Sequence, residues 1–218
     1  MCLSDIYIQY GCGLSAPAQW LNFDASPRLR LESSLVFGGL FKLTGKRLFP
    51  PNVRYGDIAL GLPVRDGSAA GVYASHVLEH LPRSAVPMAL ENTFRLLRKG
   101  GVFRMIVPDL AWRAKKYVLE RDDGLVSAAD SFIAGCMIGQ HDSATGFVAR
   151  LRAAYGNSEH KWMYDELVMK ALMAEAGFKD VRVCTMGDSG DQMFDLVERA
   201  DRFTDQGKSE LALHAIRP

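Results

Sequence analysis

Residues 84–107, SAVPMALENTFRLLRKGGVFRMIV, contain a change of hydrophobic period that indicates the fold class. The first part predicts a helix from about Ser84 to Lys99, because apolar side chains recur at helical spacing at Val86, Leu90, Phe94 and Leu97. Gly100 suits the position directly after a helix. The apolar run Val102–Val107 then predicts a buried strand, so this stretch has the helix-then-strand order of an α/β protein.

Six further short runs, rich in β-branched and aromatic residues, predict strands on either side of this unit. They are Asp5–Tyr10, Trp20–Asp24, Val53–Ile58, Gly71–Ser75, Asp180–Met186 and Glu210–Ile216. A second helix is predicted from Asp165 to Ala176, with Gly177 after its end. Its expected apolar face consists of Leu167, Val168, Ala171 and Leu172. Strands that alternate with helices favour a largely parallel sheet in a single domain spanning residues 1–218.

The composition is that of an ordinary globular protein, with 48% hydrophobic and 23% charged residues. Lys and Arg number 26 against 25 Asp and Glu, a balance that argues against stable nucleic-acid binding. No apolar run is long enough to span a bilayer and the first residues lack the pattern of a signal peptide, so we expect no membrane association and a cytoplasmic location. The four cysteines include no CxxC pair, which argues against a disulfide framework or a cysteine zinc site.

Polar or glycine residues follow four consecutive predicted strands. The first runs into Gly11-Cys12-Gly13, where a ligand can approach the backbone closely, and the second ends at Asp24, whose carboxylate suits the ribose hydroxyls of a nucleoside. The third ends at Asp57-Ile58 and the fourth at Ser75-His76. Asp24 follows Gly13 by 11 residues, whereas the dinucleotide fingerprint places its acid about 20 residues on, so an NAD site fits poorly. Because ligands of open α/β sheets bind beyond the carboxyl ends of the strands, these four ends predict a different nucleoside-binding site.

Two stretches have looser patterns. Residues 27–52 predict a helix followed by a loop. Residues of about 110–163 form a stretch too long for a simple crossover and predict a helical insertion, whose first helix carries Leu110, Ala114, Tyr117 and Val118 on one face. This insertion is rich in cations, namely Arg113, Lys115, Lys116, Arg121, Arg150, Arg152 and Lys161, with aromatic residues among them. Stacking and positive charge suit an anionic small molecule, and a solvated helix face is the alternative.

The motifs YIQYGCG, WLNFDASP, YGDIALGLPVRDGS, VYASHVLEHLP, LENTFRLLRKGGVFRMIVPDL and HKWMYDELVMKALMAEAGF occur in this order between about Ile6 and Phe178. Together they resemble class I S-adenosylmethionine-dependent methyltransferases, and especially the small methyltransferase type 11 group. The resemblance implies a Rossmann-like fold with a seven-stranded, mostly parallel sheet of order 3-2-1-4-5-7-6, an antiparallel last strand and helices on both faces. It also implies an enzyme that uses S-adenosyl-L-methionine and releases S-adenosyl-L-homocysteine.

The resemblance also implies a role for each residue of the cofactor site. Gly11, Cys12 and Gly13 would contact the methionine end through their backbone, and Asp24, next to Ala25, would hold the ribose hydroxyls. Asp57 would accept a hydrogen bond from the adenine amino group, Ile58 would pack on the ring, and the Ser75 carbonyl would face the methionine ammonium. The chain departs from the family pattern at Gln9, where members often carry an acid, and at Gly71, where an aspartate is expected.

Methyl transfer from a sulfonium is an in-line displacement, which needs alignment of donor and acceptor and exclusion of water. The expected acceptor is an oxygen or nitrogen atom of a small molecule, and a base can assist if the acceptor must lose a proton. His76, Asp109 and His160 are the candidates for that base, because each could face the methyl group; a structural or substrate-binding role is the alternative for each.

Two other functions remain open at this level. A protein that binds S-adenosylmethionine without turnover, as a partner subunit, would carry the same cofactor motifs. His76–His80 also spells H-x-x-E-H, a zinc hydrolase motif in which the two histidines share an ion from one helix. Pro82 follows almost at once and the residues up to His76 indicate a strand, so the context disfavours that hydrolase and we predict no metal site.

Overall fold

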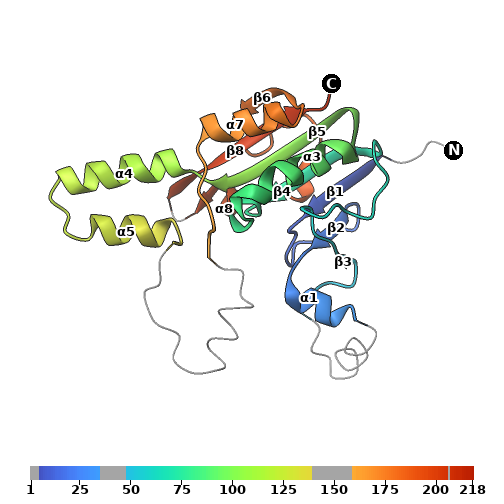
Figure 1. Ribbon diagram of the computed structural model, residues 1–218, viewed down its shortest axis with the longest axis horizontal. Coiled ribbons are helices and arrows are strands. Elements are labelled where there is room, and N and C mark those ends of the chain that lie inside the picture. The colour runs from blue at the N-terminus through green and yellow to red at the C-terminus, as the bar shows by residue number, and fades with distance from the viewer. Residues whose placement is uncertain (1–4, 35–47, 139–158, 206) are drawn as a thin grey trace.

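The computed structural model describes residues 5–34, 48–138, 159–205 and 207–218 (Figure 1). Its strands are β1 (Ile6–Tyr10), β2 (Leu21–Asp24), β3 (Val53–Tyr55), β4 (Ala69–Ser75), β5 (Leu97–Pro108), β6 (Lys179–Val183), β7 (Thr204–Asp205) and β8 (Lys208–Ile216). They form a sheet of order β3-β2-β1-β4-β5-β8-β6, in which β8 is antiparallel to both neighbours and the first five strands are parallel. The predicted order is therefore confirmed, with β8 as the seventh strand, while the short β7 that pairs with β8 was not predicted.

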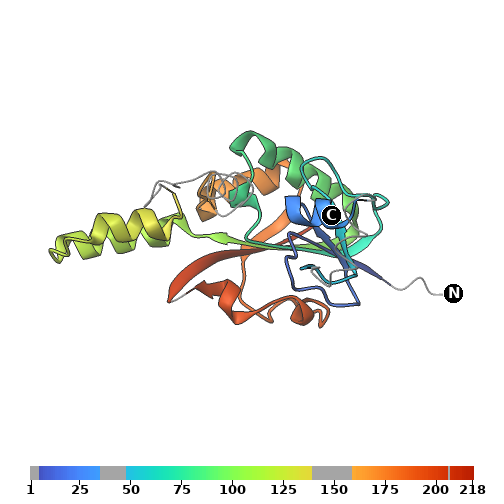
Figure 2. The ribbon, with the colours of Figure 1, turned by 90° about the horizontal axis from the view of Figure 1, so that it is seen from below.

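The helices are α1 (Pro27–Glu32), α3 (Val86–Leu96), α4 (Leu110–Asp122), α5 (Ala128–Gly135), α7 (Glu166–Glu175) and α8 (Ala200–Phe203). Three single 3₁₀ turns accompany them: η1 (Leu78–His80), η2 (Arg83–Ala85) and η3 (Phe194–Leu196). Figure 2 shows α3 and α7 on one face of the sheet and the segment with η3 and α8 on the other. Both faces of the sheet are thus covered, as a mostly parallel sheet requires.

Each face of the sheet has its own apolar core. The larger core joins Leu90 of α3 and Met169 of α7 to the buried side chains of the parallel strands. The smaller core lies on the opposite face, where Trp20 and Phe194 pack edge to face with ring centroids 5.5 Å apart. This second face is closed by residues 184–203 rather than by a long crossover helix.

The end of the helix predicted for Ser84–Lys99 is wrong. The helix ends at Leu96, and Leu97 already belongs to β5, where it pairs with Ala69 of β4. Gly100 is not a helix cap but has a left-handed φ of 73° within the long strand, and its N–H donates to the carbonyl of Arg217 at 2.7 Å. Pairing with neighbouring strands outweighs the helical propensity of this segment, as tertiary contacts commonly do.

The second predicted helix has the right ends and the wrong face. Asp165 caps α7 by accepting a hydrogen bond from the N–H of Val168 at 2.9 Å, and Gly177 follows the helix at a φ of 101°. The buried side chains are Met169, Leu172 and Met173, whereas Leu167 is 80% exposed. Two faces of this helix are apolar, and only the packing against α3 and β6 selects one of them.

Helices α4 and α5 form a pair that extends away from the sheet beyond the end of β5 (Figure 1). Tyr117 and Phe132 join the two helices with ring centroids 5.4 Å apart. Arg113 of α4 anchors the pair, because its guanidinium makes two buried hydrogen bonds to the carboxylate of Glu210 on β8. Residues 110–122 and 128–135 of the predicted insertion are therefore helical, and its residues 139–158 lie outside the described chain. Within the described residues, every helix is too short or too polar to cross a membrane.

A buried histidine on β8 predicts how stability depends on pH. Burial, with the cations Arg182 and Arg104 nearby, lowers the pKa of His214 to about 4. The unfolded chain, with an ordinary histidine pKa near 6.5, therefore takes up a proton between pH 6.5 and 4 that the folded chain does not bind, and stability falls as the pH falls. At pH 5 this one group should cost about 2 kcal/mol relative to pH 7.

Urea unfolding of the parent and of His214→Gln at pH 7 and pH 5 checks this expectation. The parent should lose more unfolding free energy between the two pH values than the variant. An identical loss in both proteins would contradict it, whatever the absolute stability of the variant.

Candidate functional site

A cavity of 290 Å³ opens where the strands β1, β2 and β4 end, next to the turn that follows β3. Its wall consists of Tyr10, Gly11, Asp24, Ala25, Ser26, Pro27, Gly56, Asp57, Ile58, His76, Val77, His80 and Leu81. The wall thus brings together residues from all four predicted strand ends. A parallel sheet places these ends at one edge, which explains why residues far apart in the sequence meet there.

Gly11 and Gly13 form a tight exit from β1. Both have left-handed φ values, 64° and 54°, and a Cβ atom on Gly11 would lie 2.2 Å from Cγ2 of Val77. Glycine is therefore required at position 11 for the conformation and for the close approach to the β4 exit. Without a side chain, Gly11 lines the cavity with its backbone, where the predicted contact with the methionine end would occur.

The carboxylate of Asp24 is oriented by the backbone on either side of it. One oxygen accepts from the N–H of Gly13 at 2.9 Å and the other from the N–H of Ser26 at 2.8 Å. Each carboxylate oxygen can accept a second hydrogen bond, so both remain available to a ligand in the cavity. Oδ1 of Asp57 accepts a hydrogen bond from the N–H of Ala59 at 2.9 Å. Ile58 is 3% exposed, and its carbonyl accepts from the side-chain amide of Asn92.

A smaller cavity, of 30 Å³, adjoins the same strand ends and includes Cys12 and Ser75 in its wall. The hydroxyl groups of Ser75 and Tyr73 are both buried and interact with each other. Burial raises the pKa of the Cys12 thiol to about 12, so this cysteine stays protonated. Gln9 lies beneath, 3% exposed, and its side-chain amide donates to the Ser15 carbonyl and to Asn22 Oδ1. At the position where the family often has an acid, Gln9 thus joins the loop after β1 to β2 by hydrogen bonds.

His76 occupies the exit of β4 in a strained conformation, with a φ of 55°. Its Nδ1 lies 3.2 Å from Oε1 of Glu79, and its Nε2 lies 3.3 Å from the carbonyl of Arg202. Burial disfavours the protonated ring, but the carboxylate of Glu79 outweighs it and raises the pKa of His76 above its ordinary value. Strained backbone concentrates at functional sites, and here it places the imidazole in the cavity wall.

The structure separates the other two predicted catalytic residues from the 290 Å³ cavity. Asp109 caps α4, where its Oδ1 accepts from the N–H groups of Ala111 and Trp112. His160 is 8% exposed, and its Nδ1 donates to the carbonyl of Cys136 at 2.7 Å, since a carbonyl can only accept a hydrogen bond. Burial lowers the pKa of His160, so the ring is neutral at pH 7.

Sequence reasoning missed His80, which lies in the cavity wall and faces His160 with ring centroids 5.0 Å apart. His80 is part of the H-x-x-E-H motif, but that motif predicted that His76 and His80 lie on one helix. His76 instead leaves a strand, and only Glu79 and His80 belong to the 3₁₀ turn η1. The long helix that the hydrolase motif needs is therefore not formed over these residues.

The amino-acid sequence and the fold were each compared with known proteins. Residues 16–183 match the model of a methyltransferase domain. Among solved structures, an S-adenosylmethionine-dependent methyltransferase from Thermotoga maritima, described as a possible histamine N-methyltransferase, has a TM-score of 0.50 at 13% identity, over 100% of this chain and 84% of that one. A second such methyltransferase, from Archaeoglobus fulgidus, has a TM-score of 0.49 at 13% identity, over 97% of this chain and 86% of that one.

A comparison with curated proteins gave no match. At 13% identity the likeness to the Thermotoga maritima structure concerns the fold alone. The domain match covers most of the chain and includes the turns that carry Asp24, Asp57 and Ser75. The chain therefore belongs to the methyltransferase domain family, and it is an enzyme that transfers a methyl group from S-adenosyl-L-methionine.

Proposed function

We propose that this enzyme methylates an oxygen or nitrogen atom of a small molecule, with S-adenosylmethionine held in the 290 Å³ cavity. The observation that carries the cofactor assignment is the presence of two carboxylates, Asp24 and Asp57, in the wall of one cavity beside the bare backbone of Gly11. The donors of a nucleoside are its ribose hydroxyls and its amino group, and two separate acceptors fit that pair.

The residues of the site fit this cofactor. Asp24 would accept from the ribose hydroxyls on its two remaining lone pairs, and the free oxygen of Asp57 would accept from the adenine amino group. Ala25 and Ile58 would border the ribose and the ring. The methionine end would reach the backbone of residues 11–13 and the backbone carbonyl of Ser75, a residue that lines the 30 Å³ cavity together with Gly11 and Cys12.

The bound cofactor supplies an electrophilic methyl group on a sulfonium, and the protein supplies alignment and a dry site. Residues of the β4 exit and of the turn η1, among them Val77 and His80, close one side of the cavity. A proton acceptor needs a free lone pair. Both nitrogens of His76 have partners, so we assign it a positioning role beside Glu79, while Asp109 serves as the cap of α4.

The acceptor would enter from the side of α4 and α5, where a second cavity of 410 Å³ includes Trp112, Tyr117 and Phe132 in its wall. Of the cations predicted to attract an anion, Arg113, Lys116 and Arg121 are each paired with a carboxylate. Lys115 and Lys161 are exposed without an ionic partner among the described residues, and Arg150 and Arg152 lie outside those residues. A preference for an anionic acceptor and a cytoplasmic location stay predictions.

Isothermal titration of the chelator-treated protein with S-adenosylhomocysteine tests the proposed site. We expect saturable binding with a stoichiometry of about one, followed by S-adenosylhomocysteine release when hydroxyl- and amine-bearing small molecules are screened with S-adenosylmethionine. Binding without any turnover would favour the alternative of a cofactor-binding partner subunit. Absence of both heat and a thermal shift on folded protein would reject the proposed cavity.

A further inference from the structure

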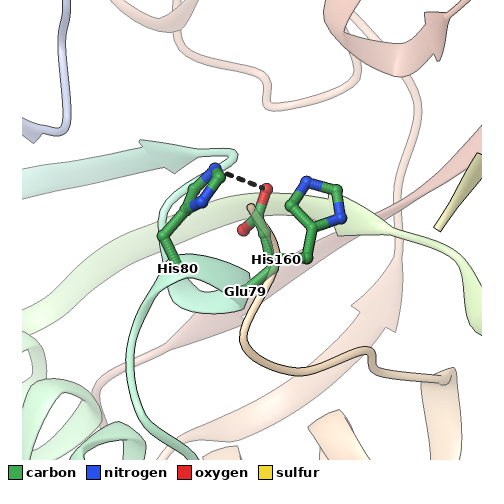
Figure 3. Close-up of side chains that lie close together, drawn as sticks. All are labelled: Glu79, His80 and His160. Atoms are coloured by element: carbon green, nitrogen blue, oxygen red, sulfur yellow. Dashed lines mark ion pairs between the residues drawn. The ribbon is translucent and has the colours of Figure 1, made fainter. Parts of the chain in front are cut away.

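Three side chains with metal-binding atoms meet beside the cofactor cavity without sharing a helix. Glu79 and His80 come from the turn η1, and His160 comes from the segment that leads into α7. One ligand atom from each lies within 4.8 Å of the other two, and Nε2 of His80 is 4.0 Å from Oε1 of Glu79. Figure 3 shows the Glu79 carboxylate between the two imidazole rings.

Both histidines are held in the orientation that metal-binding histidines adopt. Nδ1 of His80 lies 3.1 Å from the carbonyl of Glu159, and Nδ1 of His160 lies 2.7 Å from the carbonyl of Cys136. Because a carbonyl only accepts, each Nδ1 is the donor, so Nε2 is the nitrogen that remains to bind a metal ion. A second hydrogen bond of this kind, from the ring nitrogen that does not bind, is the usual support of a metal-ligating histidine.

Glu79 supplies the negative charge of the cluster. Its side chain is fully buried. Nδ1 of His76 lies 3.2 Å from Oε1, whereas Oε2 lacks a hydrogen-bond partner among the described residues. A buried carboxylate oxygen without a partner is unfavourable, and a bound metal ion would satisfy it.

The two segments of the cluster are fastened to each other through their backbones. The carbonyl of Glu79 accepts from the N–H of Lys161 at 2.8 Å and from the N–H of Trp162 at 3.2 Å. The N–H of His160 donates to the carbonyl of Met137 at 3.2 Å. These bonds set the distance between η1 and His160 independently of the side chains, so the cluster is built by the fold.

We propose that Glu79, His80 and His160 bind one divalent transition-metal ion of the zinc class. Two imidazole nitrogens and one carboxylate oxygen form a donor set that suits zinc, cobalt and iron(II), and it leaves at least one coordination position open. Bonds of about 2.0–2.2 Å to a common ion require the three ligand atoms to draw together slightly from their present separations. Rotation of the two rings and of the carboxylate provides this adjustment.

The ligand set differs from that of the H-x-x-E-H motif, because it uses His160 in place of His76. Nε2 of His76 contacts the Arg202 carbonyl, and its Nδ1 contacts Oε1 of Glu79, so neither ring nitrogen is left to bind a metal ion. His80 also belongs to the wall of the 290 Å³ cavity. The open coordination position is therefore next to the place proposed for methyl transfer, where a bound ion would hold and acidify an acceptor hydroxyl group.

Titration of the chelator-treated full chain with Co²⁺, followed by visible absorption and by competition with Zn²⁺, tests the site. We expect one equivalent to bind with ligand-field bands, and His160→Gln to weaken the affinity by about 100-fold or more. His80→Gln and Glu79→Gln should have the same effect, and they keep the proposal testable if one variant fails to fold, as checked by circular dichroism. His76→Gln removes the imidazole that contacts Oε1 of Glu79 and should bind Co²⁺ at least as tightly as the parent.

His214→Gln is the matched control, since it removes a buried histidine on β8 and should leave Co²⁺ affinity unchanged. The proposal fails if the parent binds no Co²⁺ at 100-fold excess over protein, if His160→Gln binds as tightly as the parent, or if His76→Gln alone abolishes binding. The titration contains no cofactor, so its outcome is independent of S-adenosylhomocysteine binding. Failure of the metal site and failure of the proposed methyl-transfer site are therefore distinguishable.

Discussion

Asp24→Ala is expected to weaken S-adenosylhomocysteine binding by about 100-fold. The carboxylate is held by the N–H groups of Gly13 and Ser26, so it is already oriented before a ligand arrives. Hydrogen bonds to a charged group contribute about 1.5–3 kcal/mol each. Loss of two such bonds to the ribose costs about 3 kcal/mol at the lower end of that range, which corresponds to about two decades in Kd.

Isothermal titration of the parent and the variant gives this ratio directly. Asp66→Ala is the matched control, because Asp66 pairs with Arg95 on the surface and its side chain is 56% exposed. The control should bind as the parent does, and Asp57→Ala should lie between the two, since it removes a single hydrogen bond to the adenine. Equal affinity of Asp24→Ala and the parent would show that the ribose lies elsewhere.

Glu210→Ala is expected to lower the free energy of unfolding by about 3–5 kcal/mol. Its carboxylate is 1% exposed and makes bonds of 2.8 and 3.0 Å to the guanidinium of Arg113, and it also accepts from the N–H of Asp109 at 3.3 Å. Removal leaves a buried guanidinium without its counter-charge, the more costly half of such a change. Because this pair joins α4 to β8, the helical pair on the acceptor side should loosen as well.

Urea unfolding measures this loss, with two controls. Asp122→Ala breaks the exposed pair with Arg121 and should change stability by less than about 1 kcal/mol. The double variant Arg113→Met, Glu210→Leu removes both buried charges and should recover most of the loss, because no unpaired ion remains. A double variant as unstable as Glu210→Ala would mean that packing volume, and not charge, accounts for the effect.

The boundaries of the elements show where local signals were sufficient. Asp165 and Gly177 bracket α7 in the structure as they do in the sequence, because caps act through bonds within a few residues. The predicted end of α3 was three residues too late. Leu97 pairs with β4, and Gly100 and Gly101 form backbone hydrogen bonds with Arg217, so residues 97–101 belong to β5. Strand pairing between distant segments has no local signature. The short strand β7 pairs locally with Lys208 and Ser209 of β8, and its two residues are too few to show a hydrophobic period.

The candidate site divides in the same way. Gly11, Asp24, Asp57 and His76 could be predicted as neighbours, because a parallel sheet brings consecutive strand ends to one edge whatever else the chain does. For Asp109 the structure shows the structural role that was the alternative to a base, since the first turn of α4 offers its carboxylate two backbone N–H groups. The end of β5 brings Asp109 to the same edge of the sheet, but local hydrogen bonds to the α4 backbone engage its carboxylate.

By itself the sequence determined the α/β class and the residues at the strand ends, because each depends on hydrophobic period or on the chemistry of a few adjacent residues. The strand order was predicted from the family resemblance alone. Only the tertiary structure decided that Glu79 and His80 meet His160, which lies eighty residues after His80. Their meeting depends on the hydrogen bonds from residues 161 and 162 to the Glu79 carbonyl. Contacts between distant segments follow from packing of the whole chain, and no short stretch of it encodes them.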